Sequence, residues 1–473
     1  MMDIEKPKDI PRFRRILFEQ WYRFLPKLKP QKPWLSKNDI IIGSSGEDSP
    51  SCIYVGKSNE YDTNSCDIWM DTDRAHIIYI MGKRRSGKSY TLGALAEGLV
   101  SKQWINQMKD HQAVIVFDSL NVFWGMQYLA SMEGKERISE LERWGMKEEK
   151  VPVDFYFPHG YKRDYYPDGF TEFSLSLKDL EPTDWCFMFG LDPIADPLGQ
   201  LFMDLITSLQ EQDEITFSDV HSKLESSSIK NRYEQKTLDA AFRRVRALEL
   251  AKIFDSLSIP VQEVFKEGRV SVLLLRDLEQ ELRTTVVGVL TRKIFQARGI
   301  TDECEKRLEL LSKSSVSSYK EEIRKLQLLL EKERTPRGWV LMDEAHNYVP
   351  AARRPPSKGP LVKYVKEGRN IGLSAAFATQ SPSALDASIQ ANLDIGIVHS
   401  LSRDQDILTA YNMRNTSDFE RAKIGSREIQ RNLFKEIARD LKLGYCMISS
   451  ETVNRLFTIK IRPRLSVHGG KEY

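Results

Sequence analysis

The sequence has 473 residues, of which 41% are hydrophobic and 29% charged, and its formal net charge is +3. Such a chain can bury a large core, and its length suggests about two to three domains. A charge so close to neutral gives no overall argument for nucleic acid, because affinity for phosphate needs local clusters of Lys and Arg. No apolar run approaches the roughly 20 residues that span a bilayer, and no signal peptide is evident, so we expect a cytoplasmic protein with no membrane partner. The five cysteines lie far apart with no C-x-x-C pair, which argues against a zinc site or a disulfide framework.

The N-terminal residues 1–37 form a basic, aromatic arm, in which residues 11–25 are predicted to be an amphipathic helix. Such a helix docks on its own domain or binds a neighbouring subunit or partner, and the sequence leaves both open. Residues 38–75 contain short apolar stretches separated by Gly, Ser, Asn and Asp, which predict a small β-rich module.

An α/β core is expected in residues 76–197 and 256–473. Apolar runs that alternate with helical patterns predict a mostly parallel sheet with helices on both faces. The predicted buried strands are residues 77–81, 113–117, 185–189, 270–275, 340–342, 373–378 and 395–399. Residues 198–255 are predicted to form a helical subdomain, and the charged residues 302–335 a helical insertion that projects as a hairpin.

A phosphate-binding loop is indicated by the segment GKRRSGKS at residues 82–89, which matches G-x-x-x-x-G-K-[ST] between an apolar strand and a helix. Gly82 and Gly87 permit the backbone angles that direct successive N–H groups at a phosphate, and the helix N-terminus adds its dipole. Lys88 is expected to reach the β- and γ-phosphates of ATP and Ser89 to ligate Mg²⁺. Arg84 and Arg85 should point away from the phosphates, towards solvent or an adjoining subunit. The predicted nucleotide contacts are Gly82, Lys83, Arg84, Arg85, Ser86, Gly87, Lys88, Ser89 and Tyr90.

A second acidic motif ends the apolar strand WVLM at Asp343 and Glu344. We expect Asp343 to hold Mg²⁺ through its water shell and Glu344 to orient and deprotonate the attacking water. Gln380, at the end of the strand that begins near residue 373, could contact the γ-phosphate or that water. Arg369 lies at the opposite end of the same strand, so it should point away from its own nucleotide. It could reach the γ-phosphate of a neighbour in a ring as an arginine finger, or be an ordinary surface arginine.

Four segments together resemble the HerA/FtsK superfamily of ring-forming DNA motors, on the HerA side. They are HIIYIMGKRRSGKSYTLG at 76–93, WVLMDEAHNYVP at 339–350, EGRNIGLSAAFATQSPSALD at 367–386 and IRPRLSVHGG at 461–470. The resemblance implies a RecA-like P-loop core and assigns the family's catalytic roles to Lys88, Ser89, Asp343, Glu344, Gln380 and Arg369. It further implies a homo-hexamer with ATP and Mg²⁺ at its interfaces and double-stranded DNA in a central channel. Family members work with a nuclease in DNA repair or with effectors in antiviral defence. Members of the family carry an N-terminal β-barrel. Only about 35 residues of this chain could form one, so we expect a reduced barrel here.

Candidate DNA contacts form a basic cluster between the acidic motif and Arg369, which could reach the channel or be a solvated loop. It comprises Arg353, Arg354, Lys358, Lys363 and Lys366. Arg462 and Arg464 are expected to support a subunit interface instead. The leading hypothesis is therefore an ATP-driven DNA translocase or helicase that serves a separate nuclease or effector. The alternative is a ring-forming ATPase scaffold that regulates a bound effector with little movement on DNA, while a nucleotide kinase is disfavoured by Arg369, Gln380 and the chain length.

Overall fold

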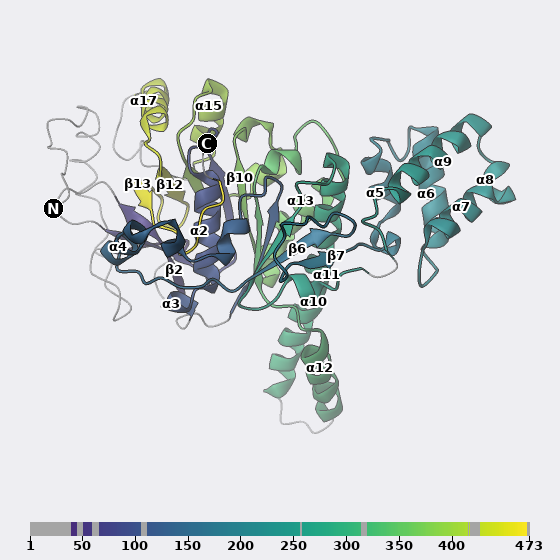
Figure 1. The fold of residues 1–473 in the computed structure, drawn as a ribbon, viewed down its shortest axis with the longest axis horizontal. Coiled ribbons are helices and arrows are strands. Elements are labelled where there is room, and N and C mark those ends of the chain that lie inside the picture. Colours follow the sequence, from purple (N-terminus) through teal and green to yellow (C-terminus); the bar gives the residue numbers. More distant parts are fainter. Residues whose placement is uncertain are drawn as a thin grey trace. The chain divides into compact units, whose positions relative to one another are not determined.

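A computed structural model (Figure 1) describes residues 39–44, 51–58, 66–105, 111–255, 258–313, 319–414, 416 and 426–470. The helix predicted within residues 1–37 lies outside this part of the chain. Two compact units are present: unit 1 takes residues 1–111, 125–151 and 374–471, and unit 2 takes residues 112–124, 152–373 and 472–473. No helix of the described residues combines the length and the apolar character that crossing a membrane requires.

The sheet of unit 1 contains β4 (Ile77–Met81), whose residues are all buried. Parallel strands flank it: Thr379 of β10 and Val398 of β11 both lie opposite Met81. Hydrophobic side chains on both faces explain why these strands are continuous apolar runs. The strand order is β1 (Ile40–Ile42), β3 (Asp67–Asp71), β2 (Cys52–Ser58), β13 (Arg455–Ile461), β12 (Tyr445–Ser450), β11 (Ile395–Val398), β4 and β10 (Leu373–Thr379).

The β-rich N-terminal segment supplies the three strands β1, β2 and β3, close to the three apolar stretches that predicted them. They extend the sheet of unit 1, because Ile459 of β13 pairs antiparallel with Ser58 of β2. The helices of this unit are α2 (Lys88–Val100), α3 (Lys102–Ile105), α4 (Lys135–Arg143), α14 (Ala387–Gln390), α15 (Asp404–Asn412) and α17 (Arg427–Asp440).

Unit 2 contains strands that pair in parallel throughout, so their carboxyl ends lie at one edge of the sheet. Met342 at the end of β9 lies opposite Phe117 of β5, which brings the residues that follow both strands close together. The order is β9 (Gly338–Met342), β5 (Ala113–Asp118), β8 (Val270–Leu274), β6 (Val153–Pro158) and β7 (Thr171–Phe173).

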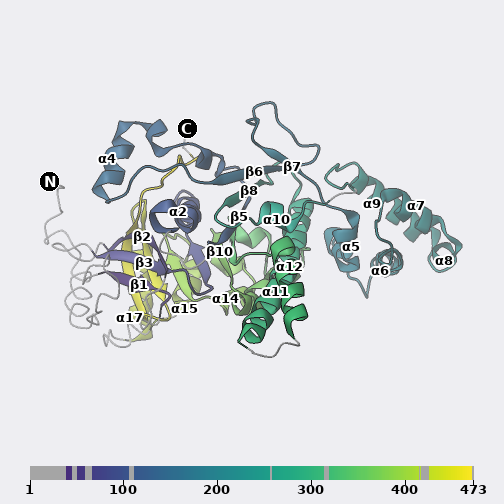
Figure 2. The same cartoon turned by 90° about the horizontal axis from the view of Figure 1, so that it is seen from below.

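Helices make up the remainder of unit 2, and α6–α9 gather into a bundle next to α5 (Figure 2). This matches the helical pattern of residues 198–255. The two helices expected in residues 302–335 are also present, since α11 continues to Ser312 and α12 returns beside it, joined by the Arg307–Glu322 ion pair. The helices are α5 (Pro182–Met188), α6 (Pro197–Leu209), α7 (Phe217–Glu225), α8 (Ser227–Lys230), α9 (Gln235–Glu249), α10 (Val261–Val264), α11 (Gln280–Ser312), α12 (Lys320–Glu333) and α13 (Lys358–Glu367).

The strand predicted at residues 185–189 is wrong, because this segment lies in helix α5. Pro182 occupies the first turn, where its missing N–H costs nothing. Asp184 accepts a hydrogen bond of 2.9 Å from the backbone N–H of Glu181 and closes a capping box. A short apolar run does not distinguish a strand from a buried helix, and the start signal decides here.

Candidate nucleotide site

The phosphate-binding loop of unit 1 leaves β4 between the ends of two parallel strands. The backbone N–H of Gly82 donates to the carbonyl of Thr379 on the β10 side at 3.2 Å, and Lys83 N–H donates to Ser400 at 2.7 Å. Gln380 follows Thr379 directly, so it lies beside the start of the loop. The structure therefore brings the predicted residues of 82–90 and Gln380 together within one unit.

The loop backbone takes the left-handed angles that such a turn requires, with φ of 62° at Arg85 and 108° at Gly87. At Gly82 a Cβ atom would lie 2.4 Å from Ser86 Oγ and 2.8 Å from His399 Cβ, so only glycine fits. The side chains of Lys83, Arg84 and Arg85 are exposed, whereas Ser86 and Lys88 are buried.

His399 supports this loop from the end of β11, and sequence reasoning gave it no role. Its ring contacts the loop, since a Cβ on Gly87 would lie 3.4 Å from His399 Cε1. Nδ1 lies 3.1 Å from the carbonyl oxygen of Tyr445, which can only accept, so Nδ1–H donates and Nε2 accepts from the Thr91 hydroxyl at 2.9 Å. Burial, together with the nearby Lys88 ammonium, lowers the pKa of His399 to about 4. The imidazole is therefore neutral at physiological pH.

This lowered pKa predicts a specific acid sensitivity. Between about pH 6.5 and pH 4, His399 takes up a proton in the unfolded chain but not in the folded one, so folding stability falls as the pH falls. When the pH falls from about 7 to 5, the free energy of unfolding should fall by on the order of 2 kcal/mol because of His399 alone. Thermal midpoints measured at both pH values should fall further in the wild type than in His399→Gln. An equal fall in both proteins would contradict the neutral imidazole.

The C-terminal segment after β13 is bonded to helix α2, which follows the loop. Glu97 of α2 is fully buried and accepts hydrogen bonds from Arg464 Nε at 2.8 Å and from the backbone N–H groups of Leu465 and Ser466 at 2.9 and 3.2 Å. The backbone N–H of Arg464 donates to the Tyr90 hydroxyl at 2.9 Å. The segment thus fixes Tyr90, the residue that follows Ser89.

Arg462 and Arg464 were expected at a subunit interface, and this expectation is wrong, because both side chains are fully buried within unit 1. Burial alone would raise the pKa of Glu97, but the guanidinium groups of Arg464 and Arg462 hold it below its usual value. A Cβ on Gly93 would lie 2.3 Å from Arg464 Nη1, so this close approach requires glycine. The motif IRPR at 461–464 therefore serves packing within the chain.

Glu97→Gln is expected to destabilise the protein strongly. It leaves two buried guanidinium groups without their carboxylate, and breaking a buried ion pair in this way costs about 3–5 kcal/mol. Chemical denaturation measures the loss, with Glu309→Gln as the control, because the exposed Glu309–Lys313 pair on α11 contributes little. A Glu97→Gln protein as stable as the control would show that the pair is not ionised.

In unit 2 the acidic motif lies at the carboxyl end of β9. Asp343 is fully buried and Glu344 is 8% exposed. Glu344 has φ of 51°, an unfavourable angle for this residue, and its N–H donates to Asp343 Oδ1 at 2.8 Å. Its Oε2 lies 3.3 Å from Nδ1 of His346. A strained turn thus fixes two carboxylates at the end of a buried strand.

Asp118 is a third carboxylate at this edge, following Phe117 on the neighbouring strand. It is fully buried and accepts backbone N–H bonds from Leu120, Val122 and Phe123 at 3.1, 3.2 and 2.9 Å. Burial raises its pKa to about 6, and the negative charge of Asp343 adds to the rise. The sequence marked Asp118 only as the end of a strand.

Comparison with known proteins covers the phosphate-binding loop, and the matched family range ends before the acidic motif. Residues 74–294 match the family model described as the central domain of helicase HerA. The DNA double-strand break repair helicase HerA of Pyrococcus furiosus is 22% identical over 219 residues, which are 45% of this chain and 39% of that protein. The probable counterpart from Methanocaldococcus jannaschii is 25% identical over the same shares.

Residues 74–294 resemble the HerA central domain. The match spans about 39% of the length of each curated relative. The solved structure of VirB4 from Thermoanaerobacter pseudethanolicus has a TM-score of 0.50 and 13% identity, covering 88% of this chain and 98% of that one. The HerA-like chain therefore has the α/β, RecA-like P-loop fold, as predicted.

The HerA-like loop has features that fit a triphosphate. Ser86 Oγ is buried and has no hydrogen-bond partner within the part of the chain that the structure describes. Lys88 Nζ donates to the carbonyl of Lys83 at 3.1 Å, so the ammonium already lies over the loop. No group of three or more His, Cys, Asp or Glu side chains among the described residues could hold a metal. Mg²⁺ in phosphate-binding loops is usually held by phosphate oxygens and water together with one or two protein oxygens, so such a cluster is not required.

The remaining predicted residues lie in the surface of unit 2. Arg369 belongs to the short helix η8 (Gly368–Ile371) before β10 and is exposed. The buried Arg298 fixes this turn by donating from Nε to the carbonyl of Ile371 at 2.8 Å. The amino end of β10 thus presents Arg369, and its carboxyl end presents Gln380.

The five candidate DNA contacts differ in their surroundings. Arg353, Arg354 and Lys366 are exposed. Lys358 Nζ instead donates to the carbonyls of Pro350, Ala351 and Arg353 at 2.8, 3.2 and 3.3 Å, which holds the loop before α13. The ammonium of Lys363 lies 5.1 Å from the centre of the Phe295 ring.

Proposed function

We propose that this HerA-like chain is an ATPase that drives movement on double-stranded DNA as a homo-hexamer. The observation that carries the proposal is the loop of unit 1 that follows the buried strand β4. In this loop Lys88 is buried, and the Ser86 hydroxyl has no partner among the described residues. The matched relatives are a DNA double-strand break repair helicase and a probable one, which supports DNA as the substrate.

In this proposal the loop of residues 82–90 holds the triphosphate, with Lys88 on the β- and γ-phosphates. Ser89 and Asp343 hold the metal, and bound Mg²⁺ would neutralise charge on the phosphate oxygens. Glu344 takes the proton of the attacking water, and Gln380 contacts that water or the γ-phosphate. Arg369 acts on the nucleotide of a neighbouring subunit.

We further propose that the motor serves a separate nuclease in DNA repair or an effector in antiviral defence. None of the proposed nucleotide-site residues lies in residues 1–37, the strands of residues 38–75, the helices of residues 198–255 or the hairpin of residues 302–335. These segments are therefore the candidates for partner contacts.

The test is ATP hydrolysis with and without double-stranded DNA, together with displacement of a triplex-forming strand from that DNA. A motor is expected to hydrolyse faster with duplex and to displace the strand only with ATP. DNA-independent hydrolysis in a stable ring with a protein bound would favour the scaffold alternative instead. Absence of hydrolysis in the wild type would refute both.

A further inference from the structure

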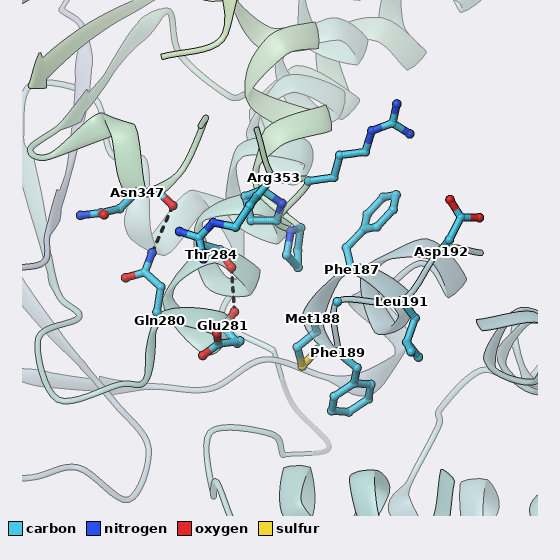
Figure 3. A pocket seen from close by; sticks show the side chains of 14 residues that line it. Phe187, Met188, Phe189, Leu191, Asp192, Gln280, Glu281, Thr284, Asn347 and Arg353 are labelled. Carbon is cyan, nitrogen blue, oxygen red and sulfur yellow. Dashed lines mark hydrogen bonds between the residues drawn. The ribbon is translucent and has the colours of Figure 1, made fainter. Parts of the chain in front are cut away.

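A pocket of about 640 Å³ lies within unit 2, outside the groups assigned to nucleotide chemistry. Three segments bound it: the end of α5 with the turn that follows, the first turn of α11, and the loop that runs from Asn347 to Pro356 (Figure 3). Its volume falls within the usual range for small-ligand sites of about 300–1,000 Å³.

The two sides of the pocket differ in chemistry (Figure 3). One side carries Phe187, Phe189 and Leu191, and the other carries Gln280 and Thr284 from α11. Both phenylalanine side chains are only partly buried. The ring of Phe189 lies 5.3 Å from that of Phe202 and 5.9 Å from the Arg244 guanidinium, whereas no such contact involves Phe187 among the described residues. Such rings stack on any nucleobase, because every base has a π-face.

Arg353 and Arg354 contribute positive charge to the pocket. Among the described residues no ion pair or hydrogen bond engages either guanidinium group. The carboxylate of Asp192 on the rim is already committed, since its Oδ1 accepts from the N–H groups of Ile194 and Ala195 at 2.9 and 2.8 Å. These two bonds, and the charge of Arg354, lower the pKa of Asp192. The two planar guanidinium groups suit a phosphate, while the exposed carboxylate of Glu281 on α11 adds one negative charge to the opposite side of the pocket.

The loop that carries these arginines is held firmly. The side chain of Gln280 donates to the carbonyl of Asn347 at 3.1 Å, and the Ser357 hydroxyl donates to that of Tyr348 at 2.6 Å. A Cβ on Gly288 would lie 2.8 Å from the carbonyl oxygen of Pro356, so α11 packs directly on the loop. A site with fixed walls loses little conformational entropy on binding.

We propose that this pocket holds an unstacked nucleotide of a single nucleic-acid strand, with the base on Phe187 or Phe189 and the phosphate on Arg353 and Arg354. The inference rests on the proposed function, since the strand would come from the DNA on which the motor acts. It adds a single-strand site to the duplex contacts, because bases stacked within a duplex cannot enter a pocket.

The pocket is also coupled to the acidic motif. Asn347 ends the short helix η7 (Ala345–Asn347), which begins directly after Glu344. The loop that lines the pocket is therefore continuous in the chain with the turn that holds the carboxylate of Glu344. Strand occupancy is expected to change the rate of ATP hydrolysis.

The test is the binding of a fluorescent oligothymidylate to the full-length protein. Fluorescence anisotropy measures the affinity at several salt concentrations. Loss of both arginines in Arg353→Ala/Arg354→Ala should weaken the affinity for the oligonucleotide at least about tenfold. The slope of log K against log salt concentration should become less steep by about 1.4, because two phosphate contacts are lost. Phe187→Ala/Phe189→Ala should weaken affinity by roughly 5- to 150-fold, the effect of losing a stacked base. Thermal midpoints show that each variant is folded.

The matched control is Lys325→Ala/Lys332→Ala, which removes two positive charges from exposed positions on α12. This control should bind the oligonucleotide almost as the wild type does. If the arginine variant binds no more weakly than the control, the pocket proposal is overturned. Thymidine monophosphate could also compete with the labelled oligonucleotide. If it competes as well as unlabelled oligothymidylate at the same nucleotide concentration, the proposal is overturned in favour of a small-molecule site.

Failure of the pocket and failure of the motor give different results. If duplex DNA stimulates the wild-type ATPase but the arginine variant binds single strands normally, the pocket proposal is refuted and the motor proposal stands. If single-strand binding depends on the arginines and phenylalanines but the wild type does not hydrolyse ATP, the motor proposal is refuted and the pocket proposal stands.

Discussion

Glu344→Gln is expected to reduce ATP hydrolysis to about 10²- to 10⁴-fold below the wild type, the range for loss of a general base. Gln keeps the size of the side chain but cannot take a proton from water. Glu344 is held in a strained turn beside the buried Asp343, so the substitution changes the chemistry of one group in a fixed position. Steady-state phosphate release measures the effect.

Nucleotide binding distinguishes this loss from a folding defect. Glu344→Gln should bind ATP as the wild type does, because Glu344 is proposed to contact the attacking water and not the phosphates. Lys88→Ala should lose both hydrolysis and binding, since the loop then lacks its buried ammonium. Full hydrolysis by Glu344→Gln would remove Glu344 as the base.

Arg369→Ala is expected to lower hydrolysis by about 10³-fold or more while each subunit still binds ATP, because an arginine finger contributes roughly 10³–10⁵ to turnover. The side chain is exposed at the amino end of β10, and Gln380 at the other end follows the strand that pairs with β4. The arginine should therefore act on a neighbour's nucleotide.

Mixed rings provide the sharpest version of this experiment. Arg369→Ala subunits keep Glu344, and Glu344→Gln subunits keep Arg369, so mixing two inactive proteins should restore part of the activity. The matched control replaces the second protein with Glu344→Gln/Arg369→Ala, which should restore none. A mixture that stays as inactive as its control would show that Arg369 does not act between subunits.

Much of the core could be predicted because its signals are local. The loop of residues 82–89 carries its chemistry in consecutive residues, and the strands β4, β5 and β9 are apolar on both faces and so appear as continuous runs. Residues 185–189 are also an apolar run, but Pro182 and Asp184 start a helix there. Apolar content alone could not separate these cases.

Other parts of the site depend on contacts between distant segments. His399 supports a loop more than three hundred residues earlier, and Glu97 holds the C-terminal segment through two buried arginines. A charged motif such as IRPR indicates a surface when only composition is considered. One buried carboxylate on α2 reverses that interpretation, and no spacing in the sequence shows it.

The most direct test of the account is the mass of the species that hydrolyses ATP, measured by light scattering across a sizing column with duplex DNA and ATP present. Each active centre is proposed to need Arg369 from another subunit, so activity should elute with a ring of about six times the chain mass of 54.6 kDa. Full activity in a species of 54.6 kDa would contradict the account.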